Sequence, residues 1–288
     1  MQTTKIGWIG LGIMGKPMCS QLINAGYNVT VYNRGKDKEA ALTAMGATAA
    51  PTPAALIHQT DVVFIMVTDD NAINQLFDGE DGLLSANTSG KLIINMSTVS
   101  PGISKNYAQL CSNSGSSYLD APVSGSQKQA EDAQLVIMVG GDVTAFTTAK
   151  PLLENIGKMV THTGAAGTGN TAKLAINTLL AIQAQGLAEA VSFAAQNGIH
   201  PQQLLNIINN SALASTFIKI KGDAISNNNY KPAFALKNIV KDLSLARDEG
   251  MASPLGTTSL NSFKEASVDY GDDDIVAIYK MLLKKMTS

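Results

Sequence analysis

The stretch Gly10-Leu11-Gly12-Ile13-Met14-Gly15 follows the apolar run Ile6–Ile9 and opens a segment with a helical pattern. In a GxGxxG between a strand and a helix, the first glycine allows the tight turn and the second lets the backbone approach a pyrophosphate. The third lets the helix pack closely on the strand. The pyrophosphate binds the unpaired N–H groups at the helix N-terminus, where the helix dipole favours an anion. We therefore predict a Rossmann-type dinucleotide site formed by residues 10–15.

The second apolar run, Asn28–Tyr32, ends where the adenine ribose of a dinucleotide should lie. An NAD site usually has Asp or Glu at this strand tip, whereas this chain has Asn33 and Arg34, followed by Lys36 and Lys38. A guanidinium group matches phosphate geometry, and a neutral amide does not repel a 2′-phosphate. A solvated basic turn is the alternative, but Arg34 is one of only two arginines against nineteen lysines. We expect NADP(H), bound by Asn33, Arg34 and Lys38.

Length and composition restrict the class of protein. A chain of 288 residues is longer than most chains that fold around a single hydrophobic core, so we expect two domains. The net charge of −2 argues against nucleic-acid and anionic-membrane partners, which require a basic face. Two cysteines and three scattered histidines predict neither a disulfide scaffold nor a metal site. These features are typical of a cytoplasmic enzyme.

Hydrophobic patterning divides the chain in two. Strand and helix signals alternate over 1–163, and continuous apolar runs such as Val62–Val67 indicate a mainly parallel sheet with helices on both faces. Ligands bind at the carboxyl ends of such strands, which assigns Val67 and Thr68 to the cofactor. Residues 164–288 read as all-helical, beginning with one long apolar helix over about 168–196 that joins the domains. A helix apolar nearly all round must be buried, and the short remainder predicts a homodimer or homotetramer.

Lys173 lies near the start of that long helix, and Asn177 follows four residues later on the same face. Loss of hydration lowers the pKa of a lysine toward that of a useful general acid. Asn177 is placed to hold the ammonium group by a hydrogen bond. The alternative reading is a lysine at a helix end that extends its charge into solvent.

Two segments with polar side chains follow strands. Asn95-Met96-Ser97-Thr98 ends one strand, and Asp120-Ala121-Pro122-Val123-Ser124-Gly125-Ser126 follows another. Hydroxyl and backbone N–H groups in such turns suit a carboxylate ligand, although a plain Ser/Gly turn has the same composition. Lys241-Asp242, on a later helix, reads by itself as a surface charge pair.

Together, residues 10–15, 120–126, 167–177 and Lys241-Asp242 resemble the β-hydroxyacid dehydrogenase family, in the right order along the chain. The resemblance implies a nicotinamide-dependent oxidoreductase. It implies Lys173 as acid/base with Asn177 beside it, and Lys241 on the cofactor side. It implies a substrate site formed by Thr98, Ser124, Gly125, Ser126, Phe234 and Asp242, with Thr98 also beside the nicotinamide.

Segment 126–132 is similar to the Ser-Lys-Lys-Pro-Ala-Glu-Asp of the glyoxylate/succinic semialdehyde reductase subgroup, and departs from it at Gln127 and Gln129. We therefore expect NADPH-dependent reduction of succinic semialdehyde or glyoxylate. A 3-hydroxyisobutyrate or tartronate semialdehyde dehydrogenase remains the alternative. An imine reductase-like enzyme is disfavoured by Lys173, which such relatives typically lack. A non-catalytic nucleotide-binding module is disfavoured by the complete lysine site.

Overall fold

The computed structural model describes residues 3–287. The chain forms two compact units, 1–173 and 174–288, and the division falls inside helix α8 (Thr168–Gln196). The sequence predicts domains over 1–163 and 164–288, with the boundary in the turn before this helix. These domain limits stay a prediction. The two units are described separately below.

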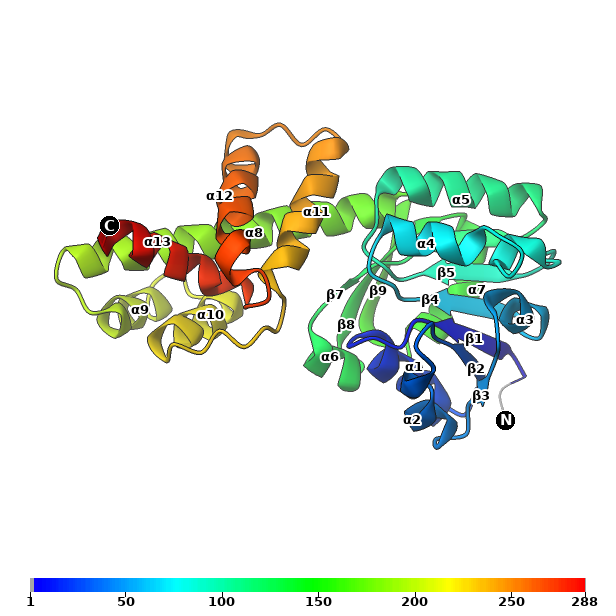
Figure 1. Ribbon diagram of the computed structural model, residues 1–288. Helices are drawn as coiled ribbons and strands as arrows, with labels where there is room; N and C mark the ends of the chain where they lie inside the picture. Colours follow the sequence, from blue (N-terminus) through cyan, green and yellow to red (C-terminus); the bar gives the residue numbers. More distant parts are fainter. Residues whose placement is uncertain (1–2, 288) are drawn as a thin grey trace. The chain divides into compact units, whose positions relative to one another are not determined.

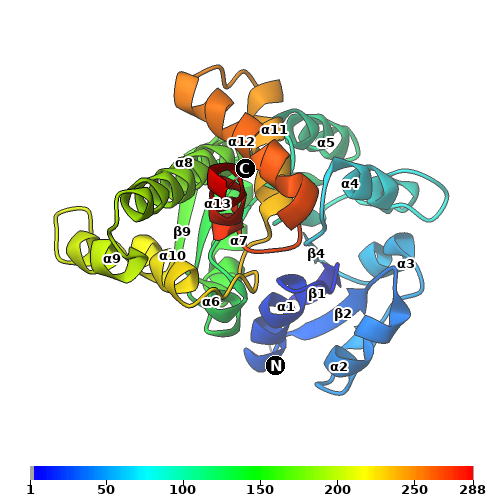
Figure 2. The same cartoon turned by 60° about the vertical axis from the view of Figure 1, so that its left-hand side comes forward.

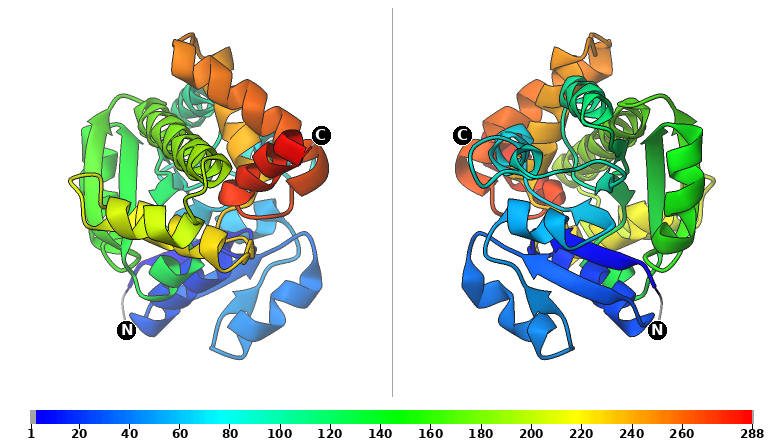
Figure 3. Two further views of the ribbon diagram at one scale, coloured as in Figure 1. Left: turned by 90° about the vertical axis from the view of Figure 1, so that its left-hand side faces the viewer. Right: turned by 90° about the vertical axis from the view of Figure 1, so that its right-hand side faces the viewer.

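The first unit is built on a largely parallel sheet (Figure 1). Its parallel strands lie in the order β3-β2-β1-β4-β5-β6, with bounds β1 Lys5–Ile9, β2 Asn28–Tyr32, β3 Thr48–Ala49, β4 Val62–Ile65, β5 Leu92–Asn95 and β6 Ser117–Asp120. This is the strand order of a doubly wound dinucleotide-binding fold, as predicted. The sheet continues into β7 (Val123–Ser124), β8 (Leu135–Gly141) and β9 (Gly157–Gly164), coloured green in Figure 3. Strand β8 runs antiparallel to β6 and β7 and parallel to β9.

Strand residues alternate between two buried layers, one on each face of the sheet. Trp8 and Phe64, whose rings stack at 5.3 Å, belong to one layer, while Val63 and Ile65 belong to the other. The first layer packs against α1 (Gly15–Asn24), α2 (Ala40–Thr43), α6 (Gln127–Glu131) and α7 (Val143–Leu153). The second packs against α3 (Pro53–His58), α4 (Asp70–Phe77) and α5 (Pro101–Asn113). Short 3₁₀ turns η1 (Lys36–Lys38) and η2 (Leu83–Ser85) lie in the connections.

The second unit is all-helical, as predicted. It comprises the rest of α8, α9 (Pro201–Asn209), α10 (Thr216–Ser226), α11 (Leu236–Asp248), α12 (Pro254–Tyr270), the 3₁₀ turn η3 (Ile275–Ala277) and α13 (Ile278–Thr287). Helices α11 and α12 form an antiparallel hairpin (Figure 2). Small and aliphatic residues of α8, such as Ala184 and Val191, form the core together with Phe263 and Ile278.

A single chain does not bury α8 on all sides. One face is in the core, but Ile176, Leu179 and Phe193 are 40%, 57% and 69% exposed. The second unit has too few residues to cover every side of a 29-residue helix. By length and apolar composition alone α8 could also cross a membrane, a test that core helices of globular domains pass as well.

Candidate functional site

The glycine-rich loop between β1 and α1 has the geometry that the motif requires. Gly10 has a φ of +94°, its N–H donates to the Tyr32 carbonyl, and a Cβ there would lie 2.1 Å from the Met66 carbonyl oxygen. A Cβ on Gly15 would lie 2.0 Å from the Gly10 oxygen, so this glycine permits the close approach of α1. Gly12 instead faces open space. The loop therefore leaves room for a pyrophosphate at the N-terminus of α1, and it fits a dinucleotide.

The other loop positions differ in exposure. Leu11 is buried in the core, Met14 is half-buried at the start of α1, and Ile13 is 75% exposed beside Gly12. The apolar Ile13 side chain therefore lies on the surface next to the open glycine.

At the C-terminal end of β2, the side chains form a hydrogen-bond network that was not predicted from the sequence. The Asn33 side-chain oxygen accepts from Leu11 N at 2.9 Å, and its Nδ2 donates to the Gly35 carbonyl at 2.7 Å. Glu39, only 7% exposed, accepts from the Asn33 backbone N–H and from Lys36 Nζ. The expectation that no carboxylate lies at this tip is therefore wrong, because η1 folds Glu39 back onto it. The Glu39 carboxylate is neutralised by Lys36 and already accepts the Asn33 backbone N–H. The Asn33 side chain in turn accepts the Leu11 N–H and so stabilises the glycine-rich loop.

Arg34 and Lys38, also at this tip, are exposed. Arg34 makes no hydrogen bond or ion pair with any residue between 3 and 287. Its guanidinium group is thus available to an external anion, in contrast to the carboxylate of Glu39.

The carboxyl ends of β4 and β5 lie side by side in the parallel sheet. The N–H of Val67, half-buried after β4, donates to Ser97 Oγ at 2.9 Å, which joins the two strand ends. Thr68 is exposed, and Thr98 is half-buried one residue after Ser97. The structure therefore brings the predicted cofactor residues Val67 and Thr68 to the same sheet edge as Thr98.

The segment after β6 is shaped by Gly125 and Gln129. Gly125 has a φ of +142°, and a Cβ there would lie 2.6 Å from a Leu135 methyl group. The Ser126 N–H and hydroxyl both bond to the Gln129 side chain at the start of α6. Gln129, which departs from the subgroup pattern, therefore caps this helix. The half-buried Ser124 hydroxyl makes no hydrogen bond within residues 3–287, unlike that of Ser126.

Lys173 lies in the second turn of α8 and is half-buried. Two fully buried polar residues lie at the start of α8: Asp120, from the end of β6, and Asn170, in the first turn of the helix. The N–H of Asn170 donates to Asp120 Oδ2 at 2.8 Å. Sequence reasoning missed both residues as parts of the site, although Asp120 lay inside a motif that it singled out.

The second unit contains the remaining predicted residues. Asn177 and Asp242 are both 2% exposed, and Asn177 Nδ2 donates to Asp242 Oδ2 at 2.6 Å. Lys241 Nζ lies 3.1 Å from Asp242 Oδ1. The reading of Lys241-Asp242 as a surface charge pair is wrong for Asp242, because α11 directs it into the core. Phe234 is half-buried in the segment before α11.

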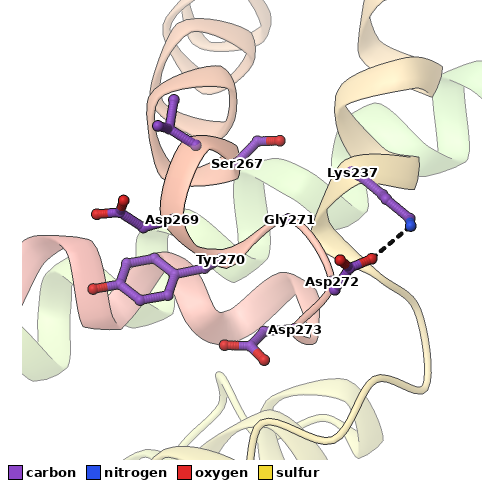
Figure 4. Close-up of a pocket in the computed structure, with 8 residues that line it drawn as sticks. Lys237, Ser267, Asp269, Tyr270, Gly271, Asp272 and Asp273 are labelled. Atoms are coloured by element: carbon purple, nitrogen blue, oxygen red, sulfur yellow. Dashed lines mark hydrogen bonds and ion pairs between the residues drawn. The ribbon is translucent and has the colours of Figure 1, made fainter.

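A polar depression at the end of α12 holds none of these residues. It is lined by Lys237 and residues 267–273 (Figure 4). Its carboxylates are paired with lysines: Asp272 with Lys237, Asp273 with Lys280 and Asp269 with Lys284. Within residues 3–287, no cluster of three or more His, Cys, Asp or Glu side chains is arranged to hold a metal ion.

Comparison with known proteins agrees with this geometry. Residues 5–164 match the NAD binding domain of 6-phosphogluconate dehydrogenase, and residues 167–282 match the family described as NAD-binding of NADP-dependent 3-hydroxyisobutyrate dehydrogenase. The chain belongs to the β-hydroxyacid dehydrogenase family. It is therefore an NAD(P)-dependent oxidoreductase that acts on CH–OH groups, with small hydroxyacids or the corresponding aldehydes as the substrates that the family implies.

Individual β-hydroxyacid dehydrogenases cover nearly the whole chain. The 2-hydroxy-3-oxopropionate reductase of Escherichia coli is 34% identical over 91% of this chain and 89% of its own length. Glyoxylate/succinic semialdehyde reductase 1 of Arabidopsis thaliana is 33% identical over 95% and 96%. The solved structure of Mycobacterium tuberculosis 3-hydroxyisobutyrate dehydrogenase with L-serine superposes with a TM-score of 0.89 at 30% identity, covering 98% of this chain and 99% of that one.

Proposed function

We propose that this β-hydroxyacid dehydrogenase reduces a short carboxylated aldehyde, succinic semialdehyde or glyoxylate, with NADPH, and that Lys173 is the general acid. Two of its relatives are named as reductases of an aldehyde that also bears a carboxylate. Similarity of segment 126–132 to the glyoxylate/succinic semialdehyde reductases supports these two substrates over the other hydroxyacids and aldehydes of the family.

The observation that carries the proposal is the position of Lys173. Its helix begins against the carboxyl end of β6, at the sheet edge where Val67 and Thr98 lie. In open α/β folds this edge is where the ligand binds. A half-buried lysine at that place can donate a proton to a ligand bound there.

When bound, NADPH supplies a hydride to the aldehyde carbon. Negative charge then develops on the carbonyl oxygen. The ammonium group of Lys173 stabilises that charge and donates its proton to give the hydroxyl. Asn177 follows Lys173 by one turn of α8, and its amide nitrogen is already committed to Asp242. Its amide oxygen is therefore the acceptor that we assign to the ammonium group.

The substrate carboxylate is assigned to the turn after β6. With Arg34 at the strand tip of β2 and Arg247 in α11, this chain has no further arginine for a carboxylate clamp. The Ser124 hydroxyl is uncommitted within residues 3–287, and Gly125 exposes its backbone. These groups are the donors that we assign to the carboxylate, since hydroxyl and N–H groups bind carboxylates well.

NADP(H) is proposed over NAD(H) because of the charges at the β2 tip. Arg34 is unpaired within the described chain, and the buried carboxylate at this tip, Glu39, is neutralised by Lys36. A 2′-phosphate at this tip would thus meet a cation with five N–H donors.

A substrate panel tests the assignment. Initial rates with glyoxylate, succinic semialdehyde and tartronate semialdehyde plus NADPH are compared with 3-hydroxyisobutyrate oxidation plus NADP⁺. The proposal expects the highest kcat/KM with succinic semialdehyde or glyoxylate. A comparable or higher kcat/KM for 3-hydroxyisobutyrate or for tartronate semialdehyde would contradict the proposal and assign the protein to the subgroup that acts on that substrate.

A further inference from the structure

The N-terminus of α8 is capped by a side chain from the sheet rather than from its own sequence. Asp120, the last residue of β6, is fully buried. Its Oδ1 accepts the Gly167 N–H at 2.7 Å, and its Oδ2 accepts the Asn170 N–H at 2.8 Å. The first N–H groups of a helix have no partner within the helix, so one carboxylate here satisfies two of them. Both Asp120 oxygens are thereby committed to the turn that precedes Lys173.

Two glycines permit this contact. A Cβ on Gly140 of β8 would lie 2.5 Å from Asp120 Oδ1, and a Cβ on Gly169 would lie 2.6 Å from the backbone oxygens of Asp120 and Met138. Any larger residue at either position would push α8 away from the sheet. The helix therefore starts as close to the ends of β6 and β8 as two backbones can approach.

Asn170 continues the contact to the next strand. It is fully buried, its Oδ1 accepts the Val99 N–H at 3.0 Å, and its Nδ2 donates to Ser104 Oγ at 3.2 Å. Val99 directly follows Thr98, which is predicted to contact nicotinamide and substrate. A single turn of α8 is therefore bound to the ends of both β5 and β6, and all of these residues belong to the first unit.

We propose that Asp120 and Asn170 are positioning residues that fix Lys173 relative to the substrate-binding strand ends of β5 and β6. The inference rests on the proposed role of Lys173. Neither side chain reaches substrate, because every polar atom of each side chain is bonded within the protein. They act by holding the helix start, since a proton donor displaced by about 1 Å loses on the order of a hundredfold in rate.

The chemistry of Asp120 gives this role a specific requirement. Each carboxylate oxygen of Asp120 accepts a backbone N–H, so both terminal atoms of the side chain at this position must be hydrogen-bond acceptors. Burial raises the pKa of Asp120, and the N–H groups of Gly167, Asn170 and Gly169 oppose that rise. In Asp120→Asn the volume is kept, but one amide NH₂ must face a backbone N–H. The variant therefore tests the hydrogen bonds separately from the packing.

A double-mutant cycle tests the proposal. Full-length Asp120→Asn and Asn170→Ala are assayed for NADPH-dependent reduction, alone and combined with Lys173→Ala, by single-turnover absorbance at saturating cofactor. NADPH affinity is measured directly by fluorescence titration, and thermal unfolding reports on the fold. Asn74→Ala is the matched control: it removes a side-chain hydrogen bond to Tyr107 in the same unit. Using two positions keeps the test valid if one variant fails to fold.

With Lys173 present, we expect each variant to lower the rate of the chemical step by roughly tenfold to a hundredfold. The NADPH dissociation constant should change less than about twofold, and Asn74→Ala should keep wild-type turnover. In the Lys173→Ala background, neither variant should cause a further loss, because both act through the missing amine. Equal losses in both backgrounds would overturn the positioning role while leaving Lys173 as the acid. Wild-type turnover by Lys173→Ala alone would instead remove the proposed function.

Discussion

The amide nitrogen of Asn177 lies 2.6 Å from the carboxylate oxygen Oδ2 of Asp242, and both side chains are almost fully buried. Asp242 comes from α11 and Asn177 from α8, so one hydrogen bond joins two helices of the second unit. Because the amide nitrogen donates to Asp242, the orientation of the Asn177 side chain is defined. A buried carboxylate thereby determines which end of the amide remains available to accept a hydrogen bond.

Loss of this pair should lower turnover. Asn177→Ala and Asp242→Ala each remove a charge-assisted hydrogen bond, worth about 1.5–3 kcal/mol, so we expect kcat to fall by roughly tenfold to a hundredfold. The double variant should be no slower than the slower single variant, because both act through one amide. Asp248→Ala, an exposed residue of the same helix, serves as the control. Losses that multiply in the double variant would show that the two residues act independently.

Removal of Arg34 should change cofactor preference. Arg34→Ala loses charge-assisted bonds to the 2′-phosphate, so NADPH affinity should weaken about tenfold or more, while NADH affinity should be barely affected. Arg247→Ala, which alters only an ion pair with Asp248 on α11, should leave both affinities unchanged. Titration of each variant with both cofactors provides the measurement. Equal affinity of the wild-type protein for the two cofactors would refute the assignment of Arg34.

The exposed apolar face of α8 predicts self-association with a second copy of this chain. Ile176, Leu179 and Phe193 lie in the surface of one continuous helix, and burying such side chains stabilises an interface by about 25 cal/mol per Å². Sedimentation should give a dimer or tetramer, and Phe193→Glu should shift it toward monomer. Val143→Glu, on the exposed part of α7, should not. A wild-type species of about 30 kDa at micromolar concentration would contradict this proposal.

Much of the fold could be predicted from local pattern. The run Val62–Ile65 and the glycine loop follow from apolar continuity and backbone sterics, which act over a few residues. Helices α6 and α7 fit the predicted alternation of strands and helices, but their own sequences give weaker signals. Helix α6 has only five residues, and α7 carries Pro151 in its interior, so neither gives a strong periodic signal.

The candidate site was less predictable because its supporting bonds join residues far apart in sequence. Glu39 at the β2 tip and Asp120 against the start of α8 act through contacts that no spacing rule contains. The exposed face of α8 depends on how many later residues are available to cover it. Helical spacing singled out Lys173 and Asn177 as residues one turn apart, whereas their roles rest on the family resemblance and stay predictions.

The most direct test of the account is the turnover of Lys173→Ala. If Lys173 donates the proton to the developing alkoxide, kcat for succinic semialdehyde or glyoxylate with NADPH should fall by about 10²–10⁴-fold. NADPH binding should persist, since the glycine loop and Arg34 are unchanged. Lys173→Arg should restore little, because a guanidinium group does not release its proton near neutral pH. A Lys173→Ala enzyme with turnover close to that of the wild type would contradict the assignment of Lys173 as the general acid.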